Sequence, residues 1–438
     1  MATGQTPPGP RGLPLVGNTH QWARDPCAFR ERCAEEYGDV VNFRMLGWDS
    51  YMVSDPDEVR RILVTEHDRF PKHEGSNGEL KEILGDGLIV SEGDLWKRQR
   101  EAITPAFRMD HIREYADIMG RRAAETADRF TAGEPVELRE EMTRLTLEIL
   151  VESMFGRDID LEARGIYDAV EAFRKPMQPR YQPVTFLAPD WVPVPFLRRA
   201  DEALDHLETQ VYDILAQRRA SDEDRDDLVS MLLDADAGMD DEQIKDEMLT
   251  FLFAGHETTA LALTFLWDLL SRNPEAAARV HEEATGVEGR PAMEDLFGLE
   301  YTEAAVREAL RLYPPAHEIR RQPVEDVEIG GYEVPEGSLV ILPTWVLHRD
   351  ERFWDGPEQF RPERFLGEQD RPEFAYFPFG GGPRHCIGER FAMMEAQIIV
   401  ATLAREWRFE REYGDLEVAA AVTLQPDGDV TMRPQRWQ

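Results

Sequence analysis

The stretch that most limits how this chain can fold is Asp241–Asn273, which is predicted to form one uninterrupted helix. At 1.5 Å per residue, such a helix is roughly 50 Å long. Its apolar middle, Met248–Leu270, resembles a membrane span. His256 and Glu257 lie near the centre of that run, and ionisable groups at this depth make spanning a bilayer costly. We therefore expect a buried helix of a globular protein.

The organisation along the chain favours one body. At about 150 residues per domain, 438 residues would make about three domains. The sequence nevertheless has no internal repeat and no Ser/Gly linker, so we expect a single domain over residues 1–438. The predicted fold class is mostly α with a minor β portion (α+β). Residues 1–60 and 320–345 are expected to form the β-rich part, and residues 60–310 and 386–405 the helical part.

Shorter segments carry local signals. Residues 26–37 are predicted to form a helix, residues 39–54 short strands, and residues 327–342 a hairpin around Gly-Gly. Residues 343–385 are rich in Pro, Gly and aromatic side chains and show little periodicity. So long an irregular segment inside a compact domain is usually functional.

The charge balance excludes several partners. Lys and Arg number 50 against 86 Asp and Glu, a formal net charge of −36 that repels nucleic-acid phosphates and anionic membranes. Only five of the basic residues are Lys. An acidic, Lys-poor surface suits concentrated salt, where screening removes self-repulsion. We hypothesise the salt-rich cytoplasm of a halophile; an acidic protein from an Arg-favouring genome is the alternative.

The three cysteines, Cys27, Cys33 and Cys386, form no disulfide framework, and their odd number favours a reducing compartment. Cys27 and Cys33 would lie about 240° apart around the helix predicted at 26–37, so we expect them to pack rather than pair. The N-terminus has no apolar signal core and no twin arginines. We expect a soluble, cytoplasmic protein without a membrane anchor.

One motif singles out Cys386. In Phe379-Gly-Gly-Gly-Pro-Arg-His-Cys386, a glycine-rich turn delivers the cysteine to the start of a predicted amphipathic helix. Helix-terminal N–H groups and Arg384 favour its thiolate. A nucleophile would need a histidine base, for which the adjacent His385 is poorly placed, and a zinc site would need further ligands. A haem iron needs only one thiolate, and a buried inert cysteine is the remaining alternative.

The run Phe379–Gly388 resembles the haem-thiolate signature of the cytochrome P450 family: Phe, Gly, any, Gly, any, Arg or His, any, Cys, any, Gly. Further motifs in the family's order extend the resemblance over about residues 90 to 390. The resemblance implies a P450-like fold with a long central helix over the haem. Cys386 would then be the axial ligand of the iron of haem b, with Phe379 and Arg384 among the residues that bind the cofactor.

Two further motifs imply a structural trio. Glu308-Ala-Leu-Arg311 resembles the Glu-x-x-Arg helix of the family, and Arg364 lies in a segment that resembles the one whose Arg joins that pair. The i,i+3 spacing puts Glu308 and Arg311 on one helix face. Taken alone, an exposed pair of this kind is common and contributes about 0–1 kcal/mol. In the family, the trio would hold the irregular segment 343–385 in place.

Within the long helix, the segment Ala254-Gly255-His256-Glu257-Thr258 contains two residues that are energetically unfavourable in the interior of a buried helix. Glycine in a helix interior costs about 1 kcal/mol relative to Ala, and Glu257 would cost more if buried unpaired. The Thr258 hydroxyl can reach the Ala254 carbonyl, four residues earlier. One interpretation is a small-residue helix contact with Glu257 at a solvated edge. The motif also resembles the acid–alcohol pair that delivers protons during dioxygen activation in P450 enzymes, where Ala254 and Gly255 would leave room for haem and dioxygen.

The resemblance also implies cationic contacts to the haem propionates. Trp96-Lys-Arg-Gln-Arg100 resembles the Trp-x-x-x-Arg helix of the family, in which i,i+4 spacing aims the indole N–H and the guanidinium at one place. A surface aromatic beside a long Arg is the alternative. Arg384 aligns with a second contact. Either Arg320 or Arg321 can serve as the third, and the alignment favours Arg321.

The resemblance to the family is weaker in two segments. The family often has apolar residues where His317 and Glu318 stand; we expect both side chains to point into solvent, and a polar substrate group is the alternative. Residues 173–197, rich in aromatic residues and proline, fit the variable lid and entrance, although such aromatics can equally be core. His348-Arg-Asp resembles a common family tripeptide, to which we assign no chemistry.

These features predict a haem-thiolate monooxygenase that inserts one atom of dioxygen into an apolar small molecule by hydroxylation or epoxidation. The chain is too short for a fused reductase, so electrons from NAD(P)H are expected through a separate ferredoxin or flavodoxin-type donor and its reductase. Lys97 and Arg98 are candidate contacts for that donor. The rivals are P450-like enzymes that rearrange or use peroxides and a haem sensor without turnover; retention of Glu257 and Thr258 argues against them.

Overall fold

The computed structural model describes residues 5–45, 47–156, 159–162, 164–174, 194–221, 225, 227–234, 238–368 and 370–437. Its internal packing divides the chain into two compact units. The first comprises Met1–Glu79, Arg307–Cys386 and Val418–Leu424, and the second Leu80–Val306, Ile387–Glu417 and Gln425–Gln438. The single domain expected for residues 1–438 stays a prediction, and most of the expected lid at 173–197 lies outside the described residues.

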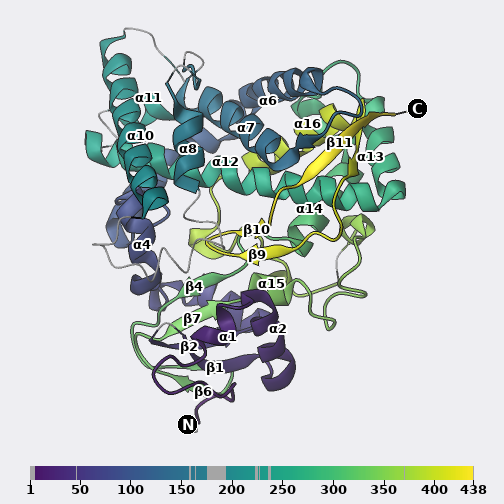
Figure 1. The fold of residues 1–438 in the computed structure, drawn as a ribbon. Coiled ribbons are helices and arrows are strands. Elements are labelled where there is room, and N and C mark those ends of the chain that lie inside the picture. Colours follow the sequence, from purple (N-terminus) through teal and green to yellow (C-terminus); the bar gives the residue numbers. More distant parts are fainter. Residues whose placement is uncertain are drawn as a thin grey trace. The chain divides into compact units, whose positions relative to one another are not determined.

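The first unit holds most of the strands, joined by short helices and turns (Figure 1). Its elements are α1 (Thr19–Trp22), α2 (Pro26–Tyr37), β1 (Val40–Met45), β2 (Trp48–Val53), α3 (Pro56–Arg60), η1 (Arg61–Thr65), η2 (His67–Arg69), β4 (Ile319–Arg321), β5 (Val327–Ile329), β6 (Tyr332–Val334), β7 (Leu339–Leu342), α15 (Thr344–Leu347), η8 (Pro362–Phe365), η9 (Glu373–Ala375), η10 (Gly382–Arg384) and β9 (Val418–Ala420).

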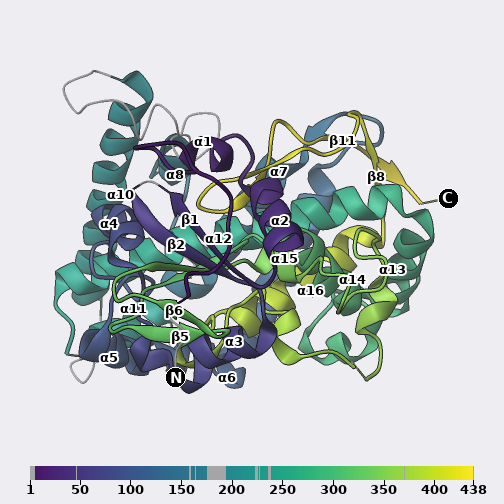
Figure 2. The same cartoon turned by 90° about the horizontal axis from the view of Figure 1, so that it is seen from below.

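Four of these strands form a sheet in the order β1-β2-β7-β4. β2 is antiparallel to β1 and parallel to β7, and β4 is antiparallel to β7. Successive side chains of a strand point to opposite faces. Accordingly, Leu339 and Ile341 of β7 pack in one apolar core with residues of α2, while Val340 and Leu342 pack in the other. The strands predicted at 39–54 are confirmed, and β1 and β2 lie side by side in Figure 2.

The hairpin predicted over 327–342 is only partly right. β5 and β6 pair around Gly330, as expected. β7 leaves them and lies between β2 and β4 of the larger sheet. All four of its side chains are buried, and a strand with two apolar faces needs cover on both, which the two apolar cores provide.

The helix α2 coincides with the prediction for residues 26–37. The Asp25 side chain caps it by accepting the Ala28 N–H at 2.9 Å, and proline occupies its first position. Cys27 and Cys33 are both buried in this helix, and burial raises the pKa of each thiol to about 12. Their predicted role as packing residues is confirmed.

The second unit holds the long helices. Its elements are α5 (Gly93–Ile103), η3 (Thr104–Phe107), α6 (Met109–Arg129), β3 (Val136–Glu137), α7 (Leu138–Leu150), η4 (Val151–Phe155), α8 (Ile166–Arg174), α10 (Pro195–Ala220), α11 (Leu228–Leu233), α12 (Asp241–Arg272), α13 (Pro274–Gly286), η7 (Met293–Gly298), α16 (Glu389–Ala404), β8 (Trp407–Arg411) and β11 (Thr431–Arg436). The unit boundary falls within or directly beside α4 (Glu74–Leu84), α14 (Glu300–Leu312) and β10 (Leu424–Pro426). β3, β11 and β8 form a three-stranded sheet.

The long helix predicted from Asp241 is confirmed as α12, which runs through this unit beside α7 (Figure 1). The Asp240 side chain caps it by accepting the Gln243 N–H at 2.9 Å, and it stops before Asn273. Among the described residues, it is the one helix long and apolar enough to cross a membrane. The protein buries 67% of its most apolar window, as expected of a core helix.

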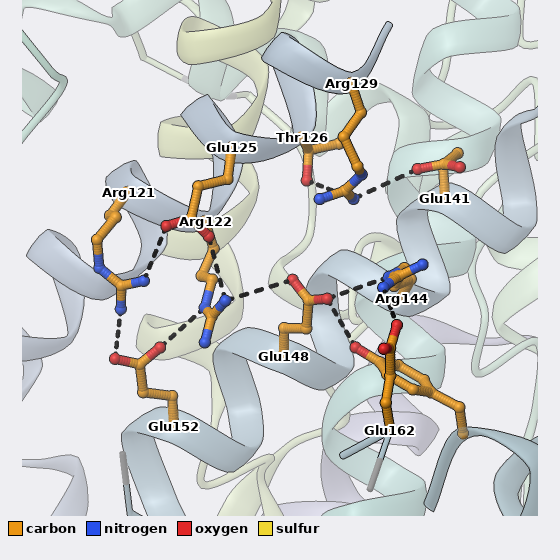
Figure 3. A network of polar contacts seen from close by, with 11 residues as sticks. Arg121, Arg122, Glu125, Thr126, Arg129, Glu141, Arg144, Glu148, Glu152 and Glu162 are labelled. Carbon is orange, nitrogen blue, oxygen red and sulfur yellow. Dashed lines mark hydrogen bonds and ion pairs between the residues drawn. The ribbon is translucent and has the colours of Figure 1, made fainter. Parts of the chain in front are cut away.

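A network of ion pairs joins α6, α7 and η4 (Figure 3). Glu152 of η4 accepts from both Arg121 and Arg122, with the Arg122 Nε at 2.8 Å, and Arg144 of α7 donates to Glu162 at 2.7 Å. The planar fork of arginine, with its five N–H donors, lets one side chain bind two carboxylates. The network braces α7, the helix that packs on α12.

Candidate functional site

Cys386 ends a glycine-rich loop in the first unit. Its N–H donates to the Phe379 carbonyl at 3.0 Å. Gly382 has a φ of +66°, and a Cβ built there would come within 2.0 Å of the Leu63 carbonyl oxygen. Only glycine combines that backbone conformation with so close an approach, so the loop is seated against the π-helical turn η1.

The thiol of Cys386 is exposed, and the side chains of Phe379 and Arg384 are half-buried. Since cysteine is among the residues most often fully buried, an exposed one is unusual. The alternative of a buried inert cysteine is therefore wrong. α16 begins at Glu389, shortly after Cys386, as expected for a cysteine delivered to a helix start. An accessible thiol near a cation suits a thiolate ligand.

The trio of Glu308, Arg311 and Arg364 assembles in the first unit. Glu308 accepts two bonds of 2.8 Å from Arg311 and one of 3.2 Å from the Arg364 Nε. Glu308 and Arg311 have no exposed side-chain surface, so this is not the exposed pair that such spacing usually gives. Arg311 and Arg364 also donate to the Gln359 and Gly356 carbonyls, which ties the trio to the irregular segment.

The middle of α12 is partly uncovered. Buried side chains flank it over residues 246–252 and 259–270. Between them lies a group of partly exposed residues, which we call the α12 strip: Phe253, Ala254, Gly255, Glu257 and Thr258. A partly exposed strip that combines apolar residues with an acid–alcohol pair suits a ligand-facing surface.

Two contacts define the polar part of the α12 strip. The Thr258 hydroxyl donates to the Ala254 carbonyl at 3.0 Å, as predicted. Glu257 lies 3.8 Å from the Arg139 guanidinium, and Arg139 in turn donates to the Gln425 side chain at 2.9 Å. No sequence motif pointed to Arg139, because only the packing of α7 against α12 brings it to Glu257.

Gly255 has a further reason for being glycine. A Cβ at this position would come within 2.8 Å of the Leu150 side chain of α7. The missing side chain therefore lets α7 pack closely on α12, in line with the interpretation as a small-residue helix contact. That Gly255 also leaves room for a ligand stays a prediction.

Trp96 and Arg100 lie one turn apart on α5 in the second unit, and both are half-buried. The i,i+4 spacing places them on one face, as the sequence predicts. Gln99, which lies between them, is buried. Its side chain accepts a hydrogen bond from the Ser91 hydroxyl and donates one to the Asp86 carbonyl, and these two bonds anchor the helix. Lys97 is exposed and pairs only loosely with Asp94, at 3.7 Å.

Arg320 and Arg321 differ in the partners of their side chains. Arg320 donates to Glu318 at 2.6 Å, whereas the Arg321 side chain donates to a backbone carbonyl. The assignment of Arg321 as the candidate cation stays a prediction. Arg30 of α2 is the second partner of Glu318. Burial alone would raise the pKa of Glu318, but Arg30 and Arg320 outweigh it and hold that pKa at about 2.

The expectation that His317 and Glu318 point into solvent is wrong. Their side chains are buried in the first unit. The His317 Nε2 lies 2.9 Å from the Ala421 carbonyl, and burial, aided by Arg30, lowers the pKa of the ring to about 4. Glu318 and the His317 Nε2 therefore have partners inside the protein, whereas the His317 Nδ1 is buried without a hydrogen-bond partner.

The residues present fit a haem. One exposed thiol offers a single ligand, and among the described residues no group of three or more His, Cys, Asp or Glu could hold a metal ion. A cofactor whose ring supplies the other iron ligands suits such a donor. Within the first unit, which also holds Cys386, the half-buried Arg321 and Arg384 are cations of the kind that bind propionates. A single accessible thiol is the donor that a haem-thiolate site needs.

Comparison with known proteins gives the family. The profile of the family described as Cytochrome P450 matches residues 7–427. Cyclooctatin synthase from Streptomyces melanosporofaciens is 36% identical, with 91% of this chain and 89% of that protein covered. Cyclooctat-9-en-7-ol 5-monooxygenase from the same organism is 33% identical, covering 91% and 88%. Cytochrome P450 3A56 from Fundulus heteroclitus is 30% identical, covering 92% and 86%. The chain belongs to the cytochrome P450 family and is an oxidoreductase.

Proposed function

We propose that the protein is a haem-thiolate monooxygenase that hydroxylates or epoxidises an apolar small molecule with electrons from a separate donor. Cys386 would bind the iron of haem b, and the trio of Glu308, Arg311 and Arg364 would hold the surrounding chain. The residues proposed to contact the rest of the cofactor are Trp96, Arg100, Arg321, Phe379 and Arg384. The observation that carries the proposal is the acid–alcohol pair on the partly exposed α12 strip.

Haem, when bound, supplies the redox chemistry that activates dioxygen, and a thiolate ligand favours O–O cleavage. The protein supplies position and protons. The Thr258 hydroxyl is held in a defined place by its bond to the Ala254 carbonyl. The Glu257 side chain is 16% exposed, so it can exchange protons with solvent while Arg139 keeps it oriented. Glu257 is thus the proposed proton source and Thr258 the group that positions the proton.

A matched pair of variants tests this assignment. Thr264 makes the same i−4 bond as Thr258 in the same helix, to the Ala260 carbonyl at 2.7 Å, but is fully buried outside the α12 strip. We expect Thr258→Ala to consume reductant and release peroxide with little product, and Thr264→Ala to keep reductant use coupled to product. Coupling that is unchanged in Thr258→Ala would remove Thr258 from the mechanism and raise the peroxide-using rivals.

The name of one relative supports a proposal for the substrate class. One is named for oxidising position 5 of cyclooctat-9-en-7-ol, an unsaturated alcohol. We infer a substrate of the same kind, largely hydrocarbon with few polar groups. A ferric spin-state titration with terpenoid alcohols and fatty acids tests this. A saturable shift with the alcohols alone is the expected result, and a shift with fatty acids alone would refute it.

The electron donor is proposed to be a ferredoxin or flavodoxin-type protein that obtains electrons from NAD(P)H through its reductase. Lys97 and the exposed Arg98 of α5 offer positive charge on a protein of formal net charge −36, where an acidic partner would otherwise be repelled. Product formation that needs such a donor and dioxygen supports the proposal. Turnover with peroxide alone at the same rate would contradict it.

A further inference from the structure

His348 follows directly after α15 in the first unit, is fully buried, and uses both nitrogens of its ring. The Nε2 atom lies 3.0 Å from the Phe377 backbone nitrogen, and the Nδ1 atom 3.2 Å from the Arg311 carbonyl oxygen. A backbone N–H can only donate and a carbonyl can only accept. The two contacts therefore require the neutral tautomer with its proton on Nδ1. Burial and Arg311 lower the pKa of His348 well below its ordinary value, which agrees with that form.

On one side, His348 is attached to the buried ion cluster. The Arg311 guanidinium, which binds Glu308, also donates to the backbone carbonyl of His348 at 2.7 Å. Ring and backbone of His348 are thus both held by the same arginine residue. The ring is further stacked on Tyr376, with 5.1 Å between centroids and 25° between planes. The two hydrogen bonds of the ring, the bond to its backbone carbonyl and the stacking on Tyr376 together determine the orientation of the imidazole.

On the other side, His348 holds the entrance of the cysteine loop. The Phe377 N–H donates to its ring, and the Phe377 carbonyl accepts the Gly380 N–H at 3.0 Å. Two residues later, the Phe379 carbonyl accepts the Cys386 N–H at 3.0 Å. A short run of backbone bonds therefore connects the amide that His348 holds with the amide of the cysteine.

We propose that His348 is a positioning residue for Cys386: it transmits the fixed geometry of the Glu308–Arg311 pair to the loop that presents the thiol. The tripeptide that contains it had no assigned chemistry, and this role goes beyond the trio of the proposed function. The consequence for the cofactor rests on the proposed function of Cys386, whereas the consequence for the loop does not.

Two substitutions separate the two bonds of the ring. In His348→Gln, the amide oxygen can take the place of Nε2 and still accept the Phe377 N–H. In His348→Asn, the shorter amide can donate from near the Nδ1 position to the Arg311 carbonyl but cannot reach Phe377. Both variants remove the imidazole from the same buried site, so a general loss of packing affects both. The bond to Phe377 is what distinguishes them.

The first readout is hydrogen exchange of the peptide that spans residues 374–386 in the haem-loaded protein. We expect exchange about fivefold faster in His348→Asn, as for loss of one hydrogen bond, and near wild type in His348→Gln. The second is the absorption band of the reduced, carbon monoxide-bound protein, which distinguishes thiolate from thiol ligation. We expect partial loss of the thiolate form in His348→Asn alone. His281→Asn, which removes an imidazole whose Nδ1 lies 2.8 Å from the Ala404 carbonyl in the second unit, is the control and should change neither.

Equal exchange in the two His348 variants would overturn the inference, because the Phe377 bond would then not hold the loop. A thiolate band that is retained in His348→Asn despite faster exchange would limit His348 to a structural role and also overturn it. Absence of the thiolate band in the wild-type protein would instead refute the proposed function of Cys386, and hydrogen exchange would still report on the loop.

Discussion

Removal of the charge of Glu308 tests how much the buried trio stabilises the protein. Glu308→Gln keeps the side-chain volume and one acceptor oxygen but takes away the negative charge. Arg311, at 2.8 Å, and Arg364, at 3.2 Å, would then be two cations in a place where their side chains are 0% and 9% exposed. Breaking a buried pair in this way costs about 3–5 kcal/mol. With two cations affected, we expect the upper part of that range, against a typical total stability of about 5–15 kcal/mol.

The chain contains a matched control. Glu202 pairs with Arg198 at 2.9 Å, almost the same distance, but these side chains are 61% and 81% exposed. Pairs of this kind on a helix surface are worth about 0.3–0.5 kcal/mol, so Glu202→Gln should be nearly neutral. Urea unfolding followed by tryptophan fluorescence measures both. Losses of less than about 1 kcal/mol for both variants would refute the reasoning, since burial would then not set the strength of the pair.

Three further outcomes are expected. Burial raises the pKa of Glu247 from 4.5 to about 8, so the folded protein binds this proton more tightly than the unfolded chain. Stability should therefore fall as pH rises from 4.5 to 8, and Glu247→Gln should remove that part of the slope; parallel profiles would contradict it. Molar salt should raise the melting temperature of a chain of formal net charge −36, and an unchanged melt would count against the halophile hypothesis. Reversing Lys97 and Arg98 to Glu should slow donor-dependent turnover several-fold at low salt, with the difference vanishing as salt rises; equal rates at low salt would exclude steering by these charges.

The parts of the site that depend on residues close together in the chain could be predicted from the sequence. The Thr258–Ala254 bond and the Glu308–Arg311 pair each lie within one helical turn, so the 3.6-residue period places their atoms together. The caps at Asp25 and Asp240 likewise act on backbone groups three residues away. The Cys386 loop also depends on nearby residues alone, because glycine is required where the backbone has a positive φ.

Contacts between residues far apart in the sequence could not be predicted from such local patterns. Nothing in the local pattern distinguishes an exposed Glu–Arg pair from one with no exposed surface, yet this difference separates the effects expected at Glu308 and Glu202. His348 illustrates the same limit: its tripeptide was noticed, but its role depends on Arg311 and Phe377, to which it is brought by the fold.

The boundary between the two kinds of information is a physical one. Sequence alone determined the long helix and the cysteine loop, because helix periodicity, capping and turn chemistry act over a few residues. The resemblance to the family rested on its motifs. Tertiary structure alone decided that Glu318 is buried with Arg30, 288 residues away, that Arg139 meets Glu257, and that β7 joins the larger sheet. These outcomes depend on which surfaces the folded chain covers, and burial, not the residue type, decides whether a charge is solvated or must find a partner.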